Sequence, residues 1–187
     1  DVLSRNPGGK IIFDVKCTRN LAPWISQHGG TPIMWKTGHS FIKSKLIETQ
    51  ALLAGEMSGH LFFKERWYGF DDGLYAGARL LELLSHQADI NAALNDLPDS
   101  LNTPELQIRM AEGENHTLIE KKKKNAVFSS AQQVITIDGL RVEYSDGFGL
   151  ARASNTTPVV VLRFEADNES ALKRIQEDFR SNILQAK

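Results

Sequence analysis

Residues 10–38, KIIFDVKCTRNLAPWISQHGGTPIMWKTG, decide the fold class of the first half of the chain. They open with β-branched and aromatic residues that are typical of a buried strand. The next stretch predicts a helix, which Pro23 should confine or bend. A second apolar run at residues 31–38 predicts another strand. Strand, helix and strand in succession indicate an α/β layer with a largely parallel sheet.

The alternation continues beyond this stretch. An amphipathic helix, a third strand, a further strand in a hairpin or bulge, and a long helix are predicted in turn for residues 40–50, 51–57, 60–68 and 73–87. Asp71 or Asp72 should cap the last of these helices. One face of that helix carries Leu74, Ala78, Leu81 and Leu84. We therefore expect an α/β domain with a mixed, largely parallel sheet and helices on both faces.

The residue composition of the sequence changes near residue 100. Residues 95–106, NDLPDSLNTPEL, hold two prolines among small polar residues and form the best candidate for a linker. We therefore place one domain at residues 1–99 and a second at residues 100–187. A helix is expected through residues 116–124, and short strands at residues 134–139 and 140–147 follow it. Residues 148–158 are expected to be a loop that feeds a strong strand.

The chain closes with a helix that Asn168 should cap. Its buried stripe should consist of Leu172, Ile175, Phe179 and Ile183. The strands and helices expected for residues 100–187 predict a small α+β domain, with an antiparallel sheet and helices on one face.

Composition excludes several classes of function. The net charge of the 187 residues is −1, which supplies no field for nucleic acid or a membrane surface. Only one cysteine, Cys17, is present, so an internal disulfide framework is excluded and a reducing cytoplasm is expected. No apolar run is long enough to span a bilayer. Residues 1–9, DVLSRNPGG, have the pattern of a helix tail, so we expect a fragment of a longer chain.

Residues 55–60, GEMSGH, interrupt an apolar run with polar groups. The carboxylate of Glu56 can accept from two adjacent sugar hydroxyls, while Ser58 and His60 can each donate or accept beside it. Ligands of α/β sheets gather beyond the carboxyl ends of strands, where this loop should lie. A plain polar turn is the alternative.

Residues 152–158, RASNTTP, contain one guanidinium, three hydroxyls and one amide, with no acid. Arg152 can form a bidentate contact with phosphate oxygens. Further donors can come from Ser154, Asn155 and Thr156. A Ser/Thr/Asn turn before a strand is the alternative.

Lys16 and His39 each follow a predicted strand, so they can meet at one edge of the sheet. A lysine there can hold a phosphate and a histidine can move a proton. Each alone also fits an exposed lysine and a capping histidine.

The lysine run at residues 121–124 is interpreted as a solvated helix face, and the acidic pair at residues 71–72 as a cap rather than a metal site.

Five stretches together closely resemble the bacterial phosphomannomutase/phosphoglucomutase branch of the α-D-phosphohexomutases: DVKCTR, WKTGHS, GEMSGH, FKERWYGFDDG and RASNTTP. The resemblance extends over essentially the whole chain, and the motifs stand in family order. Members of the family have four domains around one cleft. The resemblance implies that this chain is most of the third domain, with its N-terminal helix truncated, followed by the whole fourth domain.

The resemblance also implies roles for the residues above. Glu56 and Ser58, with His60 beside them, match the loop that contacts the hexose O3 and O4 hydroxyls. The matching residues of the phosphate-binding loop of the fourth domain are Arg152, Ser154, Asn155 and Thr156. Lys16 and His39 match basic residues of the cleft, where Lys16 would help to hold phosphate and both could assist catalysis. The two loops fit the dual mannose/glucose branch best.

Family members move a phosphoryl group from a phosphoserine to the sugar and pass through a bisphosphorylated intermediate. They use Mg²⁺ and a hexose 1,6-bisphosphate activator. The Ser-His-Asn phosphoserine loop and the Asp-Gly-Asp metal loop of the family do not occur in this sequence. We therefore expect a hexose phosphate substrate, the N-terminal domains 1 and 2 as partners, no metal or cofactor held by these residues, and no turnover by this chain alone. A stand-alone, non-catalytic sugar-phosphate-binding module is the alternative.

Overall fold

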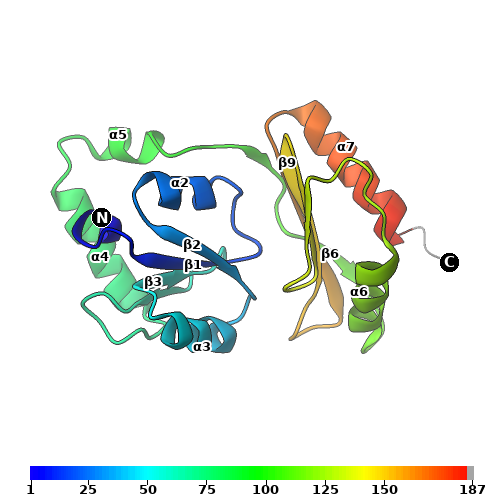
Figure 1. Ribbon diagram of the computed structural model, residues 1–187, viewed down its shortest axis with the longest axis horizontal. Coiled ribbons are helices and arrows are strands. Elements are labelled where there is room, and N and C mark those ends of the chain that lie inside the picture. Colours follow the sequence, from blue (N-terminus) through cyan, green and yellow to red (C-terminus); the bar gives the residue numbers. More distant parts are fainter. Residues whose placement is uncertain (185–187) are drawn as a thin grey trace. The chain divides into compact units, whose positions relative to one another are not determined.

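The computed structural model describes residues 1–184 (Figure 1). The chain divides into two compact units, Asp1–Asp99 and Ser100–Lys187. Within residues 1–184, no helix is long and apolar enough to cross a membrane.

The first unit is built on a four-stranded sheet with the order β2-β1-β3-β4. These strands span, in chain order, Lys10–Asp14, Thr31–Trp35, Leu53–Gly55 and Leu61–Phe63. Strand β1 runs parallel to β2 and to β3, and β4 closes the sheet antiparallel to β3. Every residue of β1 after Lys10 is buried, as expected for a central parallel strand covered on both faces. The predicted mixed, largely parallel sheet is confirmed.

Helices cover both faces of this sheet. The helices of the unit, α1 to α5, span Val2–Arg5, Leu21–Gln27, His39–Thr49, Gly73–Ser85 and Ile90–Asn95. Side chains along β1 alternate between two cores. Ile11 and Phe13 pack with Ile25 of α2 in one core, and Ile12 packs with residues of α3 in the other.

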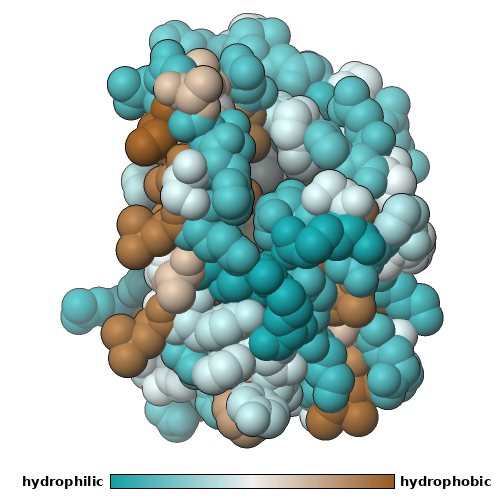
Figure 2. Space-filling model, turned by 90° about the vertical axis from the view of Figure 1, so that its left-hand side faces the viewer, coloured by the Kyte–Doolittle hydropathy of each residue, from teal (hydrophilic) through white to brown (hydrophobic). Residues whose placement is uncertain are grey.

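The face of α4 that the sequence analysis grouped is not the buried face. Leu74 is 90% exposed and Leu81 is 69% exposed, whereas Arg79 is buried. The guanidinium of Arg79 lies 4.6 Å from the ring centroid of Phe63 and forms an ion pair of 2.8 Å with Glu65. A buried charge is tolerated only where it is paired, and the pairing of Arg79 with Glu65 is not visible in the amphipathic pattern. That pattern therefore predicted the wrong face of α4 to be buried. Brown apolar groups interrupt the mostly teal surface in Figure 2, the face of the molecule on the α4 side.

Glu65 is the buried carboxylate of this ion-pair cluster. Arg5 donates to it at 3.2 Å, in addition to the contact with Arg79. Burial acts to raise the pKa of Glu65, but hydrogen bonds from Arg5 and Arg79 outweigh burial and hold the pKa below its usual value. The ionised cluster therefore stabilises the unit at neutral pH, and this contribution is lost as the pH falls through the lowered pKa.

The second unit is built on an antiparallel sheet with the order β5-β10-β9-β8-β7, in which β6 also pairs with β10. The strands β5 to β10 span Leu101–Asn102, Leu106–Arg109, Gln133–Ile135, Leu140–Tyr144, Gly147–Ala153 and Val159–Ala166. Residues 148–153, which were expected to be part of a loop, belong to the central strand β9, and the expectation was wrong there. Glycines weaken a strand pattern, but a Cβ at Gly149 would lie 2.3 Å from the Phe179 ring, so the position has no room for a side chain.

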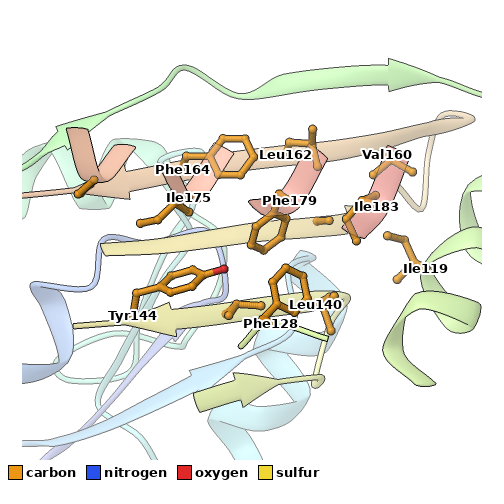
Figure 3. Close-up of a cluster of buried hydrophobic side chains, with 14 of the residues drawn as sticks. Ile119, Phe128, Leu140, Tyr144, Val160, Leu162, Phe164, Ile175, Phe179 and Ile183 are labelled. Atoms are coloured by element: carbon orange, nitrogen blue, oxygen red, sulfur yellow. The ribbon is translucent and has the colours of Figure 1, made fainter. Parts of the chain in front are cut away.

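Helices α6 (Glu114–Asn125) and α7 (Glu169–Phe179) cover one face of this sheet, as predicted. The Asn168 side chain caps α7 by accepting from the Ala171 amide at 2.9 Å. Figure 3 shows Phe179 of α7 among the side chains of the sheet, with ring centroids 4.9 Å from Phe128 and 5.4 Å from Phe164. A π-helical turn, Arg180–Leu184, follows α7.

The lysine run of α6 is not wholly solvated. Lys122 is 7% exposed, and its ammonium donates to the carbonyl of Asn182. Burial, together with repulsion from Lys121, lowers the pKa of Lys122. Lys123 is partly exposed and pairs with Glu120 on the same helix. Charge alone therefore does not reveal that Lys122 joins α6 to the π-helical turn that follows α7.

Candidate functional site

The loops that follow β1, β2 and β3 meet at the carboxyl ends of these strands, where ligands of α/β sheets bind. The amide of Val15 donates to the carbonyl of Trp35 at 3.1 Å, which joins the first loop to the end of β2. The hydroxyl of Thr37 donates to Asp14 at 2.9 Å, and the amide of Met57 donates to Asp14 at 3.3 Å. One carboxylate therefore connects all three loops.

Asp14 was not singled out from the sequence. Its side chain is completely buried, and besides Thr37 and Met57 it accepts from the Lys16 amide at 3.2 Å and the Cys17 thiol at 3.1 Å. A carboxylate with four donors is the arrangement that a buried charge requires. The signal in the sequence is an aspartate that ends a buried strand, because such a charge must find partners nearby.

Glu56 occupies the first position after β3 and is 8% exposed. One carboxylate oxygen accepts from the Gly38 amide at 3.1 Å, and the other accepts from the Ser58 hydroxyl at 3.4 Å. The Glu56 amide donates to the His60 carbonyl at 2.9 Å, which closes the turn. Each carboxylate oxygen has two lone pairs, so each retains capacity for a ligand hydroxyl. The carboxylate is thus held in place before any ligand arrives.

The remaining residues predicted for this edge lie on the same group of loops. His39 is exposed and begins α3, directly after the glycine that donates to Glu56. Lys16 is 7% exposed and is anchored through its amide on Asp14, so it is not the exposed lysine of the alternative reading. His60 is half exposed, and its Nδ1 lies 2.9 Å from a carboxylate oxygen of Asp71.

In the second unit, the loop of residues 154–158 joins β9 to β10. The Ser154 hydroxyl oxygen lies 3.3 Å from the amide nitrogens of Thr156 and Thr157 and accepts from both. Asn155 and Thr156 are exposed at the tip of this loop. A tight turn with an exposed tip presents hydroxyls and an amide to solvent, which is the arrangement that an anion-binding loop needs.

Arg152 is the last but one residue of β9 and is 5% exposed. Its Nε lies 3.1 Å from a carboxylate oxygen of Asp138. This contact is made by Nε and not by the terminal nitrogens Nη1 and Nη2 of the guanidinium. The turn that carries Asp138 approaches closely because the next residue is Gly139, with φ of 85°. A Cβ there would lie 2.5 Å from the Ala151 carbonyl oxygen and 2.6 Å from the Arg152 Cβ.

Asn115 of α6 anchors the 154–158 loop and was missed by the sequence analysis. It is 2% exposed, and its amide nitrogen donates to the carbonyls of Ser154 at 3.1 Å and Val159 at 3.2 Å. A buried side chain that donates to a loop carbonyl and to the first carbonyl of β10 has no periodic signature, so sequence patterns do not find it.

Replacing Asn115 with alanine should destabilise the second unit by about 1–2 kcal/mol, because the buried carbonyls of the loop lose their donor. Hydrogen exchange of the Ser154 amide, which donates to the Val159 carbonyl, should accelerate more than exchange in the sheet. Asn125→Ala on the exposed end of the same helix is the matched control. Equal protection in both variants would contradict the anchoring role of Asn115.

No group of three or more histidine, cysteine, aspartate or glutamate side chains among residues 1–184 is arranged to hold a metal ion. Asp72 of the acidic pair accepts from the Tyr75 amide at 2.9 Å and caps α4.

Comparison with known proteins identifies both units. Residues 1–101 match the family described as phosphoglucomutase/phosphomannomutase, alpha/beta/alpha domain III. Residues 105–182 match the family described as phosphoglucomutase/phosphomannomutase, C-terminal domain. A crystal structure of a phosphoglucomutase/phosphomannomutase family protein from Burkholderia thailandensis superposes with a TM-score of 0.91 at 66% identity, over 97% of this chain and 38% of that one.

Curated relatives agree with the family models. A phosphoglucomutase of Neisseria meningitidis serogroup A is 64% identical over 98% of this chain. A phosphomannomutase/phosphoglucomutase of Pseudomonas aeruginosa is 56% identical over 98% of the chain. The chain spans about 40% of the length of each of these relatives. Two consecutive domain models and this level of identity lead to one conclusion: the chain belongs to the phosphoglucomutase/phosphomannomutase family.

Proposed function

We propose that the full-length protein interconverts hexose 1-phosphate and hexose 6-phosphate, with mannose or glucose as the sugar, through a phosphoserine and a bisphosphorylated intermediate. In this proposal the chain supplies substrate recognition and has no turnover alone. The observation that carries it is the Glu56 carboxylate, which Gly38 and Ser58 hold in place at the carboxyl edge of the sheet. Relatives of high identity bear the names phosphoglucomutase and phosphomannomutase/phosphoglucomutase.

In this proposal, Glu56 and Ser58 bind the O3 and O4 hydroxyls of the hexose. Glucose and mannose differ at O2, so a grip on O3 and O4 serves both sugars. It also serves a sugar bound in either orientation, which a mutase requires because the phosphoryl group must be transferred at two ends. His60 completes the loop, and its role is developed below.

The second loop is proposed to hold the phosphate that is not being transferred. Arg152 supplies the charge, and Ser154, Asn155 and Thr156 supply neutral donors. Neutral donors bind phosphate without adding further charge, which leaves the intermediate able to dissociate and rebind in the other orientation. Lys16 and His39 add a phosphate contact and a proton-transfer group at the edge of the first sheet.

The remaining parts of the reaction are assigned to the rest of the full-length protein, which we place in the cytoplasm. The phosphoserine, the Mg²⁺ that neutralises charge on the phosphoryl group and the response to hexose 1,6-bisphosphate belong to its N-terminal domains. Residues of this chain would bind and orient the sugar phosphate.

Glu56→Gln in the full-length protein tests the proposal. The amide nitrogen that replaces one carboxylate oxygen cannot accept from a sugar hydroxyl, and the negative charge is lost, so we expect kcat/KM for mannose 1-phosphate and glucose 1-phosphate to fall about a hundredfold. Glu48→Gln is the matched control, since Glu48 is an exposed residue of α3 paired with Lys45. Unchanged kcat/KM in Glu56→Gln would refute the role of Glu56. Conversion of either sugar phosphate by the 187-residue chain alone would refute the division of labour.

A further inference from the structure

We propose that Asp71 is a positioning residue, which holds the His60 imidazole in the tautomer protonated at Nδ1 and leaves Nε2 to hydrogen-bond a hydroxyl of the bound sugar. The ligand part of this inference rests on the proposed function. The tautomer part stands on the geometry of the free chain. The acidic pair at residues 71–72 was expected to form a helix cap, and Asp72 is the residue that caps α4.

The contact between His60 and Asp71 determines which ring nitrogen carries the proton. His60 Nδ1 lies 2.9 Å from an Asp71 carboxylate oxygen. An ionised carboxylate can only accept, so Nδ1 must donate and the neutral ring must accept through Nε2. The side chains of His60 and Asp71 are 52% and 33% exposed, so a ligand can reach the ring.

The position of Asp71 is fixed by its own backbone and by the residue that follows it. Its backbone forms an antiparallel bridge with Phe62, the buried middle residue of β4. The following residue, Asp72, is fixed by its cap on α4 and by a hydrogen bond of 3.2 Å from the Trp67 indole. The carboxylate therefore stands beside β4, at the strand end where His60 lies, before any ligand binds.

His60 belongs to the same turn as the proposed sugar grip. Its carbonyl accepts from the Glu56 amide at 2.9 Å, and Ser58 lies between them in the turn. An imidazole that donates to a carboxylate through one nitrogen presents the other nitrogen as a hydrogen-bond acceptor. The arrangement adds a group of defined tautomer to a loop that otherwise contributes a carboxylate and a hydroxyl.

The tautomer can be measured in this chain by long-range ¹H–¹⁵N NMR of the imidazole rings at a pH above the histidine titration. In the wild type, we expect the His60 pattern of a ring protonated at Nδ1. Asp71→Ala should convert it to the pattern protonated mainly at Nε2, whereas Asp71→Asn should retain the Nδ1 form because its amide oxygen still accepts. His28, whose Nδ1 lies 2.8 Å from the Trp24 carbonyl, is the internal reference and should not change. A wild-type ring protonated at Nε2, or no change in Asp71→Ala, would overturn the inference.

The contribution to the reaction is measured in the full-length protein. We expect Asp71→Ala to lower kcat/KM for mannose 1-phosphate about tenfold, and Asp71→Asn to recover most of the loss. Wild-type activity in Asp71→Ala would overturn the positioning role. Absence of activity in the wild type would instead overturn the proposed function, and the NMR result would still decide the tautomer. The two failures are therefore distinguishable.

Discussion

Replacing Asp14 with alanine should destabilise the first unit by about 3 kcal/mol or more and disorder the loop of residues 55–60. Four donors converge on this buried carboxylate, from the loops after β1, β2 and β3. Hydrogen bonds to a charged acceptor contribute about 1.5–3 kcal/mol each, and a buried donor that loses its acceptor costs about 1–3 kcal/mol. Alanine leaves all four donors without this acceptor.

Asp14→Asn keeps the shape of the side chain and one acceptor oxygen, so it separates loss of the charge from loss of the hydrogen bonds. The amide oxygen can keep the three contacts now made to one carboxylate oxygen, and the Thr37 hydroxyl can turn to accept from the amide nitrogen. We therefore expect a loss of only about 1 kcal/mol for Asp14→Asn.

Tryptophan fluorescence during urea unfolding reports this unit selectively, because all three tryptophans lie in it, at Trp24, Trp35 and Trp67. The transition should shift to lower urea in Asp14→Ala, and hydrogen exchange of the Met57 and Gly59 amides should accelerate. Equal midpoints for the alanine and asparagine variants would contradict the account of Asp14 as the connection between the loops.

Replacing Phe179 with alanine should destabilise the second unit by about 3–5 kcal/mol. The ring is 1% exposed and packs against Phe128 and Phe164. It also lies directly over Gly149, where no side chain could move in to fill the space. Because β9 is the central strand and cannot collapse onto α7 without breaking its pairs with β8 and β10, the cavity should persist.

Hydrogen exchange of the β9 and β10 amides measures this loss, since the second unit contains no tryptophan. Leu172→Ala is the matched control on the same helix, because Leu172 is only partly buried beside the same core. We expect it to cost clearly less than Phe179→Ala. Similar protection of β9 in both variants would mean that the core repacks around the missing ring.

The elements of the first unit follow from local patterns. Each strand there is a short apolar run bounded by polar or turn-forming residues, so neighbouring residues carry the information. Caps are equally local: Asp72 and Asn168 reach amides three residues away. The candidate loops were found from neighbouring residues too, since Glu56 and Ser58 follow a predicted strand and Arg152 opens a run of hydroxyl and amide residues.

Other features depend on contacts that no local pattern contains. The outward face of α4 was predicted wrongly because Arg79 pairs with Glu65, fourteen residues away in sequence, and covers Phe63. Residues 148–153 of β9 were taken for a loop because the need for glycine at position 149 appears only once the Phe179 ring is seen against it.

The sequence by itself determined the fold class, the family and the residue types that the two loops present, because hydrophobic period, strand ends and motif order are properties of neighbouring residues. Only the tertiary structure decided what holds those residues. Asp14 meets Met57 across 43 positions, and Asn115 meets Val159 across 44. Such pairs form because a buried polar group must find a partner wherever the fold brings one within reach, and sequence separation does not limit that search.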